Sequence, residues 1–131
     1  KSDKGWGVGA HSYTIHKTPT WMVDASVNET FDTYVSHQDQ VTAVPPGATV
    51  LASSDFCNNA MLAIGDTVLT LQSHPEMPSA YVGDLYDVRR ARIGEEKVDA
   101  ALTTVAKTSH APDADRVATW IGAFLTQALE S

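Results

Sequence analysis

The sequence has a single cysteine, Cys57, among its 131 residues. An internal disulfide is therefore excluded, and we expect the reducing setting of the cytoplasm. Uninterrupted apolar runs are only a few residues long, so the sequence predicts no transmembrane helix and no apolar region of a signal peptide. The chain begins at Lys1 and not at a methionine. We therefore expect it to be a piece of a longer protein.

Basic residues are also scarce. Nine Lys and Arg stand against 16 Asp and Glu, for a net charge of −7. Because nucleic acids and anionic membranes are bound through clustered Lys and Arg, this charge argues against both partners. Glycines alternate along Gly5–Gly9, but there is no Gly-x-Gly-x-x-Gly and no lysine-bearing phosphate loop. We therefore expect no nucleotide and no other cofactor.

What the sequence does contain is a set of short strand patterns in its first half. Alternating apolar residues and turn signals such as Gly65-Asp66 predict five strands. After Glu76 the apolar period changes to about 3.6 residues, which predicts helices. Strands followed by helices are typical of an α+β fold. The strands are expected at 8–16, 33–37, 49–52, 60–64 and 67–72, and the helices around 79–86, 98–105 and 112–129.

These patterns predict a single domain piece over residues 1–131, rich in strands over 1–76 and helical over 77–131. The last helix is expected to bury a stripe formed by Val117, Ile121, Phe124, Leu125 and Leu129. Tyr81 and Tyr86, at helical spacing, are expected to pack in the core or in a groove.

The most informative stretch is His74-Pro75-Glu76, directly after the strand predicted at 67–72. Pro75 disfavours the α region for His74, so we expect the tripeptide to be extended. His74 and Glu76 would then point to the same side. A carboxylate that accepts from one imidazole nitrogen leaves the other free as a base. The pair would form two thirds of a nucleophile–base–orienter triad.

Other interpretations of this stretch are a surface turn and a metal site. A proline turn with polar neighbours is common on protein surfaces. His37, His74 and Glu76 could be metal ligands, but their spacing matches no familiar ligand motif. We therefore expect no metal.

Cys57 is the one thiol within the chain that could complete the triad. Nucleophiles of this kind usually sit at a glycine-flanked strand-to-helix elbow. Cys57 instead lies between Phe56 and Asn58, between two predicted strands. A buried structural thiol is the simpler interpretation.

A second polar cluster, Ser36-His37-Gln38-Asp39, ends the strand predicted at 33–37. Its plain interpretation is a loop in which Asp39 caps local backbone. Together with 71–76, however, it resembles the second half of a class I glutamine amidotransferase domain of the stand-alone, GMP-synthase-like type. The resemblance covers about residues 1 to 80. It is carried by Gly5-Trp6-x-x-Gly9, Ser36–Val41, Pro45–Ala48, Leu51–Ser54 and Leu71–Glu76.

The resemblance implies an α/β fold: the C-terminal half of an open, largely parallel sheet flanked by helices, with a small antiparallel section. It also implies that His74 is the general base and Glu76 its orienter in a Cys-His-Glu triad that hydrolyses glutamine to glutamate and ammonia. Residues that match Tyr34, Val35, Ser36 and His37 hold the glutamine in that family, partly through backbone groups.

The sequence departs from the family at the nucleophile. The family's cysteine lies in a Gly-x-Cys-x-Gly elbow upstream of the glycine-tryptophan motif, and these 131 residues contain no such elbow. We expect the isolated chain to be inactive and to pair with the missing N-terminal half or with a second copy. Two alternatives remain: a γ-glutamyl peptidase or hydrolase on the same fold, or a non-catalytic interaction module of amidotransferase shape.

Overall fold

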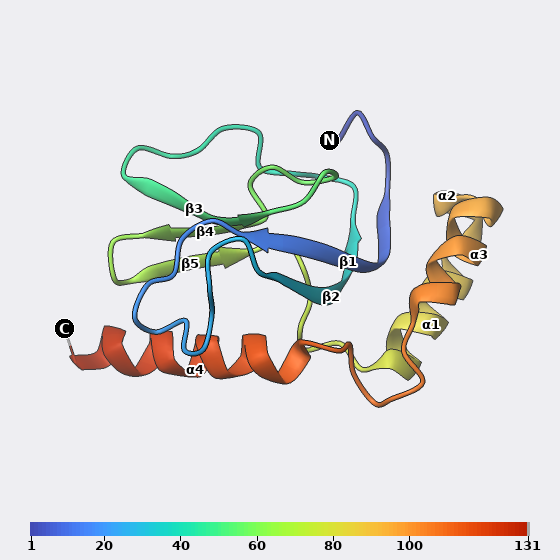
Figure 1. Cartoon of the computed structure of the whole chain (residues 1–131). Coiled ribbons are helices and arrows are strands. Elements are labelled where there is room, and N and C mark those ends of the chain that lie inside the picture. The colour runs from blue at the N-terminus through green and yellow to red at the C-terminus, as the bar shows by residue number, and fades with distance from the viewer. Residues whose placement is uncertain (131) are drawn as a thin grey trace.

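The computed structural model describes residues 1–130 and contains a five-stranded sheet with four helices (Figure 1). The strand order is β2-β1-β3-β4-β5, and every pair of neighbouring strands is antiparallel. The strands are β1 (Gly7–Ile15), β2 (Thr30–His37), β3 (Ala48–Ser53), β4 (Met61–Ile64) and β5 (Val68–Leu71).

The antiparallel sheet corrects the expectation of an open, largely parallel one. Parallel neighbours need a crossover of a dozen or more residues, usually a helix. All four helices of residues 1–130 follow β5, so no helix connects two strands. The α/β class implied by the resemblance is therefore wrong for this chain. The order of strands before helices gave the better indication.

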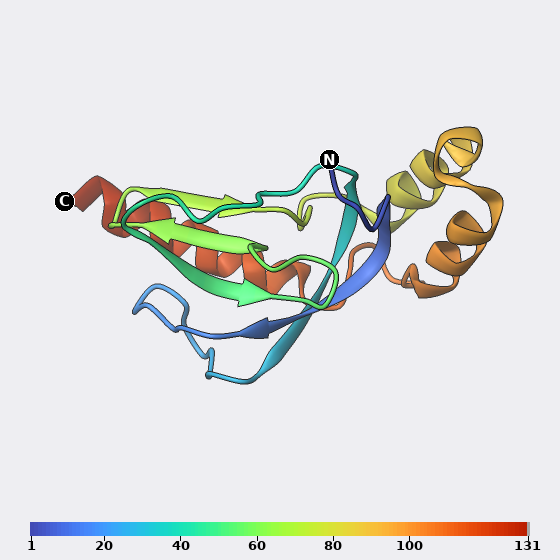
Figure 2. The ribbon, with the colours of Figure 1, turned by 90° about the horizontal axis from the view of Figure 1, so that it is seen from above.

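The sheet is curled into a half-barrel, in which β1 pairs with β2 along most of its length and with β3 only at its end (Figure 2). It pairs with β2 from Gly7↔His37 to Thr14↔Thr30, but with β3 only at Thr14↔Ser53 and Ile15↔Ala52. The strands β3, β4 and β5 therefore extend from one end of β1. The predicted turn at Gly65-Asp66 joins β4 to β5, and Gly65 adopts a φ of 54° there.

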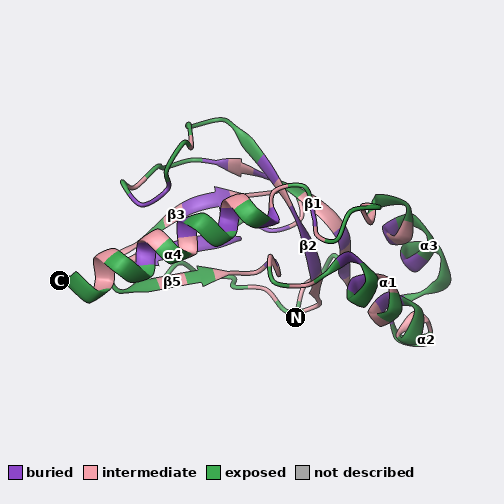
Figure 3. Ribbon diagram, turned by 90° about the horizontal axis from the view of Figure 1, so that it is seen from below, coloured by how far each residue is buried: buried purple, intermediate pink, exposed green. Residues whose placement is uncertain are grey.

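The long C-terminal helix α4 (Ala114–Glu130) runs beneath the sheet (Figure 1). Its buried positions are spaced by three or four residues, as an amphipathic helix requires, and Figure 3 shows the buried side facing the strands. The predicted stripe is correct for Val117 and Phe124, and Ile121 is partly buried against the same core. Trp120 takes the central place, whereas Leu125 and Leu129 are exposed.

Three further helices form a separate layer at the other end of β1 and β2 (Figure 1). They are α1 (Ser79–Val88), α2 (Arg90–Ile93) and α3 (Glu95–Thr104). Here α3 lies close to β1, where Gly9 has a φ of 97° and a Cβ would approach Thr104 Oγ1 to 2.7 Å. Tyr86 is fully buried in this layer, whereas Tyr81 is 52% exposed, contrary to expectation.

The hydroxyl of Tyr86 connects the two longest strands. It accepts from the backbone N–H of Gly9 at 2.8 Å and donates to the carbonyl of Val35. Burial raises the pKa of Tyr86 to about 12, an effect that the bond from Gly9 opposes. Burial likewise raises the pKa of Tyr13 in β1. Ionisation of either hydroxyl would therefore destabilise the folded state.

The pKa of Tyr86 predicts alkaline instability. The folded state holds this proton more tightly than the unfolded state, whose tyrosines titrate near pH 10. The resulting stability is complete below about pH 10 and falls as the pH rises toward 12. Urea unfolding at several pH values should show this decline, and it should be shallower in Tyr86→Phe. An equally steep decline in Tyr86→Phe would contradict the prediction.

The connection between β1 and β2 supplies core residues that the sequence did not predict. Trp21 and Met22 are both buried, although they lie in a stretch rich in polar residues. The ring of Trp21 meets that of Phe124 edge to face, with centroids 5.3 Å apart. Within residues 1–130, no helix has the length and apolar character to cross a bilayer.

Candidate functional site

The two polar clusters meet where the loop after β5 crosses to β2. These two strands are at opposite ends of the strand order, but the curl of the sheet brings the loop back. The backbone N–H of His74 donates to the carbonyl of Tyr34 at 2.8 Å. At the start of the loop, Gln72 accepts from the N–H of Val41 at 3.2 Å. His74 is therefore fixed against the end of β2 that carries Ser36-His37.

His74 and Glu76 contact each other directly, through a turn. The Nδ1 of His74 lies 2.7 Å from Oε1 of Glu76. The expected extended tripeptide is wrong, because Pro75 and Glu76 form a turn closed by a bond from the N–H of Met77 to the His74 carbonyl at 3.3 Å. Proline favours the second position of such turns. The contact holds the imidazole with Nε2 free of partners within residues 1–130.

The surroundings of His37 lower its pKa, and His74 is one of the groups that act on it. Burial is the largest cause of this lower pKa. The carbonyl of Asp39, 3.1 Å from the Nδ1 of His37, raises the pKa, whereas the charge of His74 lowers it further. Phe56 stands edge-on to the rings of both His37 and His11, with centroids 5.7 and 5.3 Å away. Burial also lowers the pKa of His11. Of these three rings, only His74 has a carboxylate partner.

Tyr34 and Val35 have buried side chains, so only their backbone can face a ligand. The hydroxyl of Tyr34 lies 2.7 Å from Ser79 Oγ and accepts from the N–H of Ala106 at 2.9 Å. The sequence did not predict these two hydrogen bonds of the Tyr34 hydroxyl. Their signal is weak, because a tyrosine that bonds inside a protein looks like any other apolar residue in a helical or strand pattern.

Ser36 and His37 each have an enclosed polar atom without a partner in residues 1–130: Ser36 Oγ and His37 Nε2. A buried polar group without a hydrogen bond costs roughly 1–3 kcal/mol. The two residues are consecutive in β2, so their side chains point to opposite faces of the sheet. The hydroxyls of Tyr13 and Thr33, away from His74, are also enclosed without a partner in residues 1–130, so this property alone does not mark a ligand site.

Ser36→Ala is therefore expected to leave the chain as stable as the parent or more stable, by up to about 1 kcal/mol, because it removes the unpaired hydroxyl. Thermal unfolding measures this. Thr126→Ala, which removes an exposed hydroxyl bonded to the Gly122 carbonyl at 2.9 Å, is the matched control. A loss of more than about 1 kcal/mol in Ser36→Ala would show that the hydroxyl supports the fold after all.

Cys57 takes no part in these contacts. Its side chain is fully buried in the core between the sheet and α4. Burial raises the pKa of its thiol, although the backbone of Asn59 opposes this, so the thiol stays protonated at neutral pH. A buried, protonated thiol is a poor nucleophile. Nor do any three His, Cys, Asp or Glu side chains in residues 1–130 gather as metal ligands.

Two plant proteins resemble this chain in sequence. γ-Glutamyl peptidase 3 of Arabidopsis thaliana is 32% identical over 108 residues, which cover 78% of this chain and 43% of that protein. γ-Glutamyl peptidase 5 of the same plant is 28% identical over 90 residues, 66% of this chain and 36% of that protein. The chain therefore spans less than half the length of these relatives. No family model matches it.

Solved structures agree on the fold. The structure of a glutamine amidotransferase from Thermotoga maritima superimposes over 100% of this chain and 54% of its own length, with a TM-score of 0.70 at 15% identity. A glutamine amidotransferase from Methylobacillus flagellatus gives a TM-score of 0.64 over 99% of this chain and 54% of its own length, at 19% identity.

Proposed function

We propose that this chain, which has the class I glutamine amidotransferase-like fold and is homologous to γ-glutamyl peptidases, supplies the base and the orienting carboxylate of a γ-glutamyl hydrolase. The observation that carries the proposal is the 2.7 Å contact between His74 Nδ1 and Glu76. It leaves Nε2 available to a thiol. That thiol comes from a cysteine outside these 131 residues, because Cys57 is enclosed in the core.

In the proposed reaction, His74 Nε2 takes the proton of the external thiol as sulfur attacks the γ-carbonyl carbon of the glutamyl group. His74 then gives that proton to the departing amine as the C–N bond breaks. A water molecule, activated by the same nitrogen, hydrolyses the thioester to release glutamate. Glu76 keeps the imidazole in one tautomer and stabilises the imidazolium formed in each half of the cycle.

The outer edge of β2 is the proposed binding surface for the glutamyl group. The backbone of Asp32 bonds outward to Asp113, and the Tyr34 carbonyl bonds outward to His74. Alternate residues of a strand face the same edge, so the N–H and carbonyl of Ser36 point there too. We assign the glutamyl α-amino and α-carboxyl groups to this backbone between Tyr34 and His37, with Val35 kept in place by Tyr86.

Glutamine amide hydrolysis is the second candidate, because it uses the same acyl group and differs only in the leaving amine. The sequence relationship favours the peptidase, because both similar plant proteins carry that name. The solved amidotransferase structures are only 15–19% identical to this chain, so they support the fold and not the reaction. The partners we propose are a γ-glutamyl compound and the segment that bears the cysteine, whether in the same chain or in a second protein.

The test uses the complete protein that contains these 131 residues. It should cleave γ-glutamyl dipeptides with a higher kcat/KM than it releases ammonia from free glutamine. The isolated chain should do neither. Ammonia release as the faster reaction would favour the amidotransferase, and no reaction in the complete protein would favour a non-catalytic module. Activity of the isolated chain that Cys57→Ala abolishes would overturn the account.

A further inference from the structure

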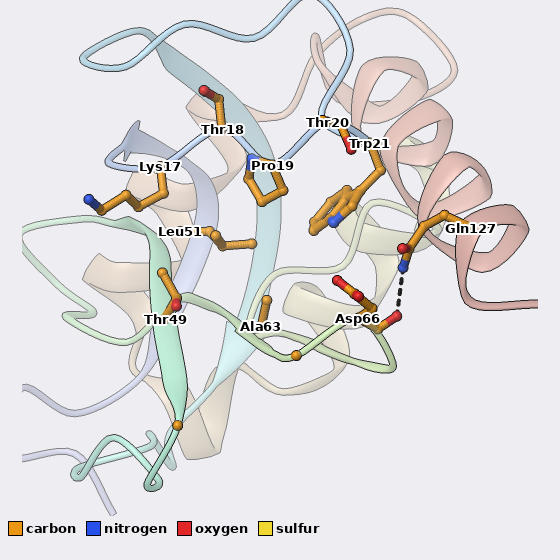
Figure 4. Close-up of a pocket in the computed structure, with 12 residues that line it drawn as sticks. Lys17, Thr18, Pro19, Thr20, Trp21, Thr49, Leu51, Ala63, Asp66 and Gln127 are labelled. Carbon is orange, nitrogen blue, oxygen red and sulfur yellow. Dashed lines mark hydrogen bonds between the residues drawn. The ribbon is translucent and has the colours of Figure 1, made fainter. Parts of the chain in front are cut away.

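A cavity lies at the opposite end of the sheet from His74. It has a volume of about 600 Å³ and opens between the connection after β1, strand β3, the Gly65-Asp66 turn and α4 (Figure 4). β1 begins opposite His37 and ends at Ile15, two residues before the cavity's Lys17. The nine residues of β1 separate the two places by roughly 25 Å. The cavity is therefore distinct from the proposed hydrolase site.

The wall of this cavity contains an indole N–H without an acceptor in residues 1–130. Trp21 is 6% exposed and lines the cavity, yet its indole N–H donates to no atom of residues 1–130. The other buried tryptophan, Trp120, donates its N–H to the Val23 carbonyl at 3.0 Å. Figure 4 shows the indole of Trp21 projecting into the cavity on the side of Asp66. A ligand acceptor would take the place of water at this N–H.

The cavity also carries two opposite charges that have no ion-pair partner in residues 1–130. Asp66 lies in the exposed turn, whose backbone is fixed because its carbonyl accepts from Gln127 Nε2 at 2.6 Å. Lys17 lies on the far side of the cavity from Asp66, and its side chain points away from Trp21 and Asp66 (Figure 4). Its flexible stem allows the ammonium group to turn toward a ligand anion. Leu51 and Ala63, both almost completely buried, contribute apolar atoms to the lining between Lys17 and Asp66.

We propose that this cavity binds a small zwitterionic peptide of dipeptide size. The ligand's α-ammonium group pairs with Asp66, its amide carbonyl accepts from the Trp21 N–H, and its carboxylate pairs with Lys17. An apolar side chain covers Leu51. The volume lies within the range of drug-sized ligand sites, about 300–1,000 Å³, and exceeds what a single amino acid needs. No covalent step is involved.

The experiment follows the side-chain N–H of Trp21 by NMR in ¹⁵N-labelled chain. The chain has three tryptophans, so three indole signals are expected, and Trp21→Phe identifies the relevant one. Addition of leucyl-glycine at millimolar concentration should shift the Trp21 signal and leave that of Trp120 in place. N-acetyl-leucyl-glycine lacks the ammonium group and leucyl-glycinamide lacks the carboxylate. Each should bind about two- to fivefold more weakly, as the loss of one exposed ion pair predicts.

Asp66→Asn keeps the shape of the turn and should weaken leucyl-glycine about two- to fivefold. It should not affect leucyl analogues that lack the ammonium group. Asp84→Asn, at an exposed position of α1 outside the cavity, is the matched control and should bind as the parent does. If the Trp21 signal does not shift at the highest soluble concentration of leucyl-glycine, the proposal is overturned. Binding that is indifferent to Asp66→Asn would also overturn it. Neither result depends on hydrolase activity.

Discussion

Replacing His74 by alanine in the complete protein is expected to lower kcat/KM for a γ-glutamyl dipeptide by roughly 10⁴- to 10⁶-fold. The reason is that the members of a triad act as a unit, and the external thiol loses its base. Glu76→Gln should cost less, roughly 10²- to 10⁴-fold, because Glu76 works only through the imidazole it orients. Its side chain is 65% exposed, so water replaces part of its effect.

Steady-state kinetics on purified variants measure both losses, and circular dichroism establishes that each variant is folded. Cys57→Ala is the control, because its thiol lies in the core and touches no proposed catalytic group. It should keep kcat/KM within a few-fold of the parent. Full activity in His74→Ala would remove the histidine from the mechanism, and loss of activity in a folded Cys57→Ala would assign the nucleophile differently.

The largest effect on stability is expected from Trp120→Ala, at about 3–5 kcal/mol. Trp120 is fully buried between α4 and the sheet, and its ring meets that of Phe31 in β2 edge to face at 5.2 Å. Its N–H also donates to Val23 in the β1–β2 connection. The substitution therefore leaves a large cavity and removes a buried hydrogen bond.

Urea unfolding of Trp120→Ala measures the loss. Leu129→Ala on the same helix is the control: its side chain is 89% exposed, and its unfolding free energy should change by no more than about 0.5 kcal/mol. Equal effects at the two positions would mean that α4 does not pack through Trp120. A loss below about 1 kcal/mol in Trp120→Ala would contradict the core described above.

The sequence predicted the elements better than their arrangement. Alternation and turn residues located all five strands, because each strand carries its own signal. The direction of pairing was wrong where it relied on the family resemblance, since the fold of a whole domain was transferred to a chain that spans about half of it. The absence of any helix between strands was already visible in the periodicity and pointed to antiparallel pairing.

The candidate site was predicted in part. The His74–Glu76 contact was expected, but its cause is a turn at Pro75 and not an extended segment. The hydrogen bonds that hold β2 in place join residues far apart in the sequence. The Tyr86 hydroxyl, for example, bonds to the Val35 carbonyl 51 positions away. No local pattern marks such a partner. Trp21 was missed for a similar reason, because a single buried aromatic in a polar connection has no periodicity.

The central claim is that His74 and Glu76 serve a cysteine that is not Cys57. The most direct measurement treats the complete protein with an electrophilic γ-glutamyl analogue and locates the modified residue by peptide mapping. The account predicts modification of a cysteine outside these 131 residues, and a slower reaction in His74→Ala. Modification of Cys57 instead would contradict it.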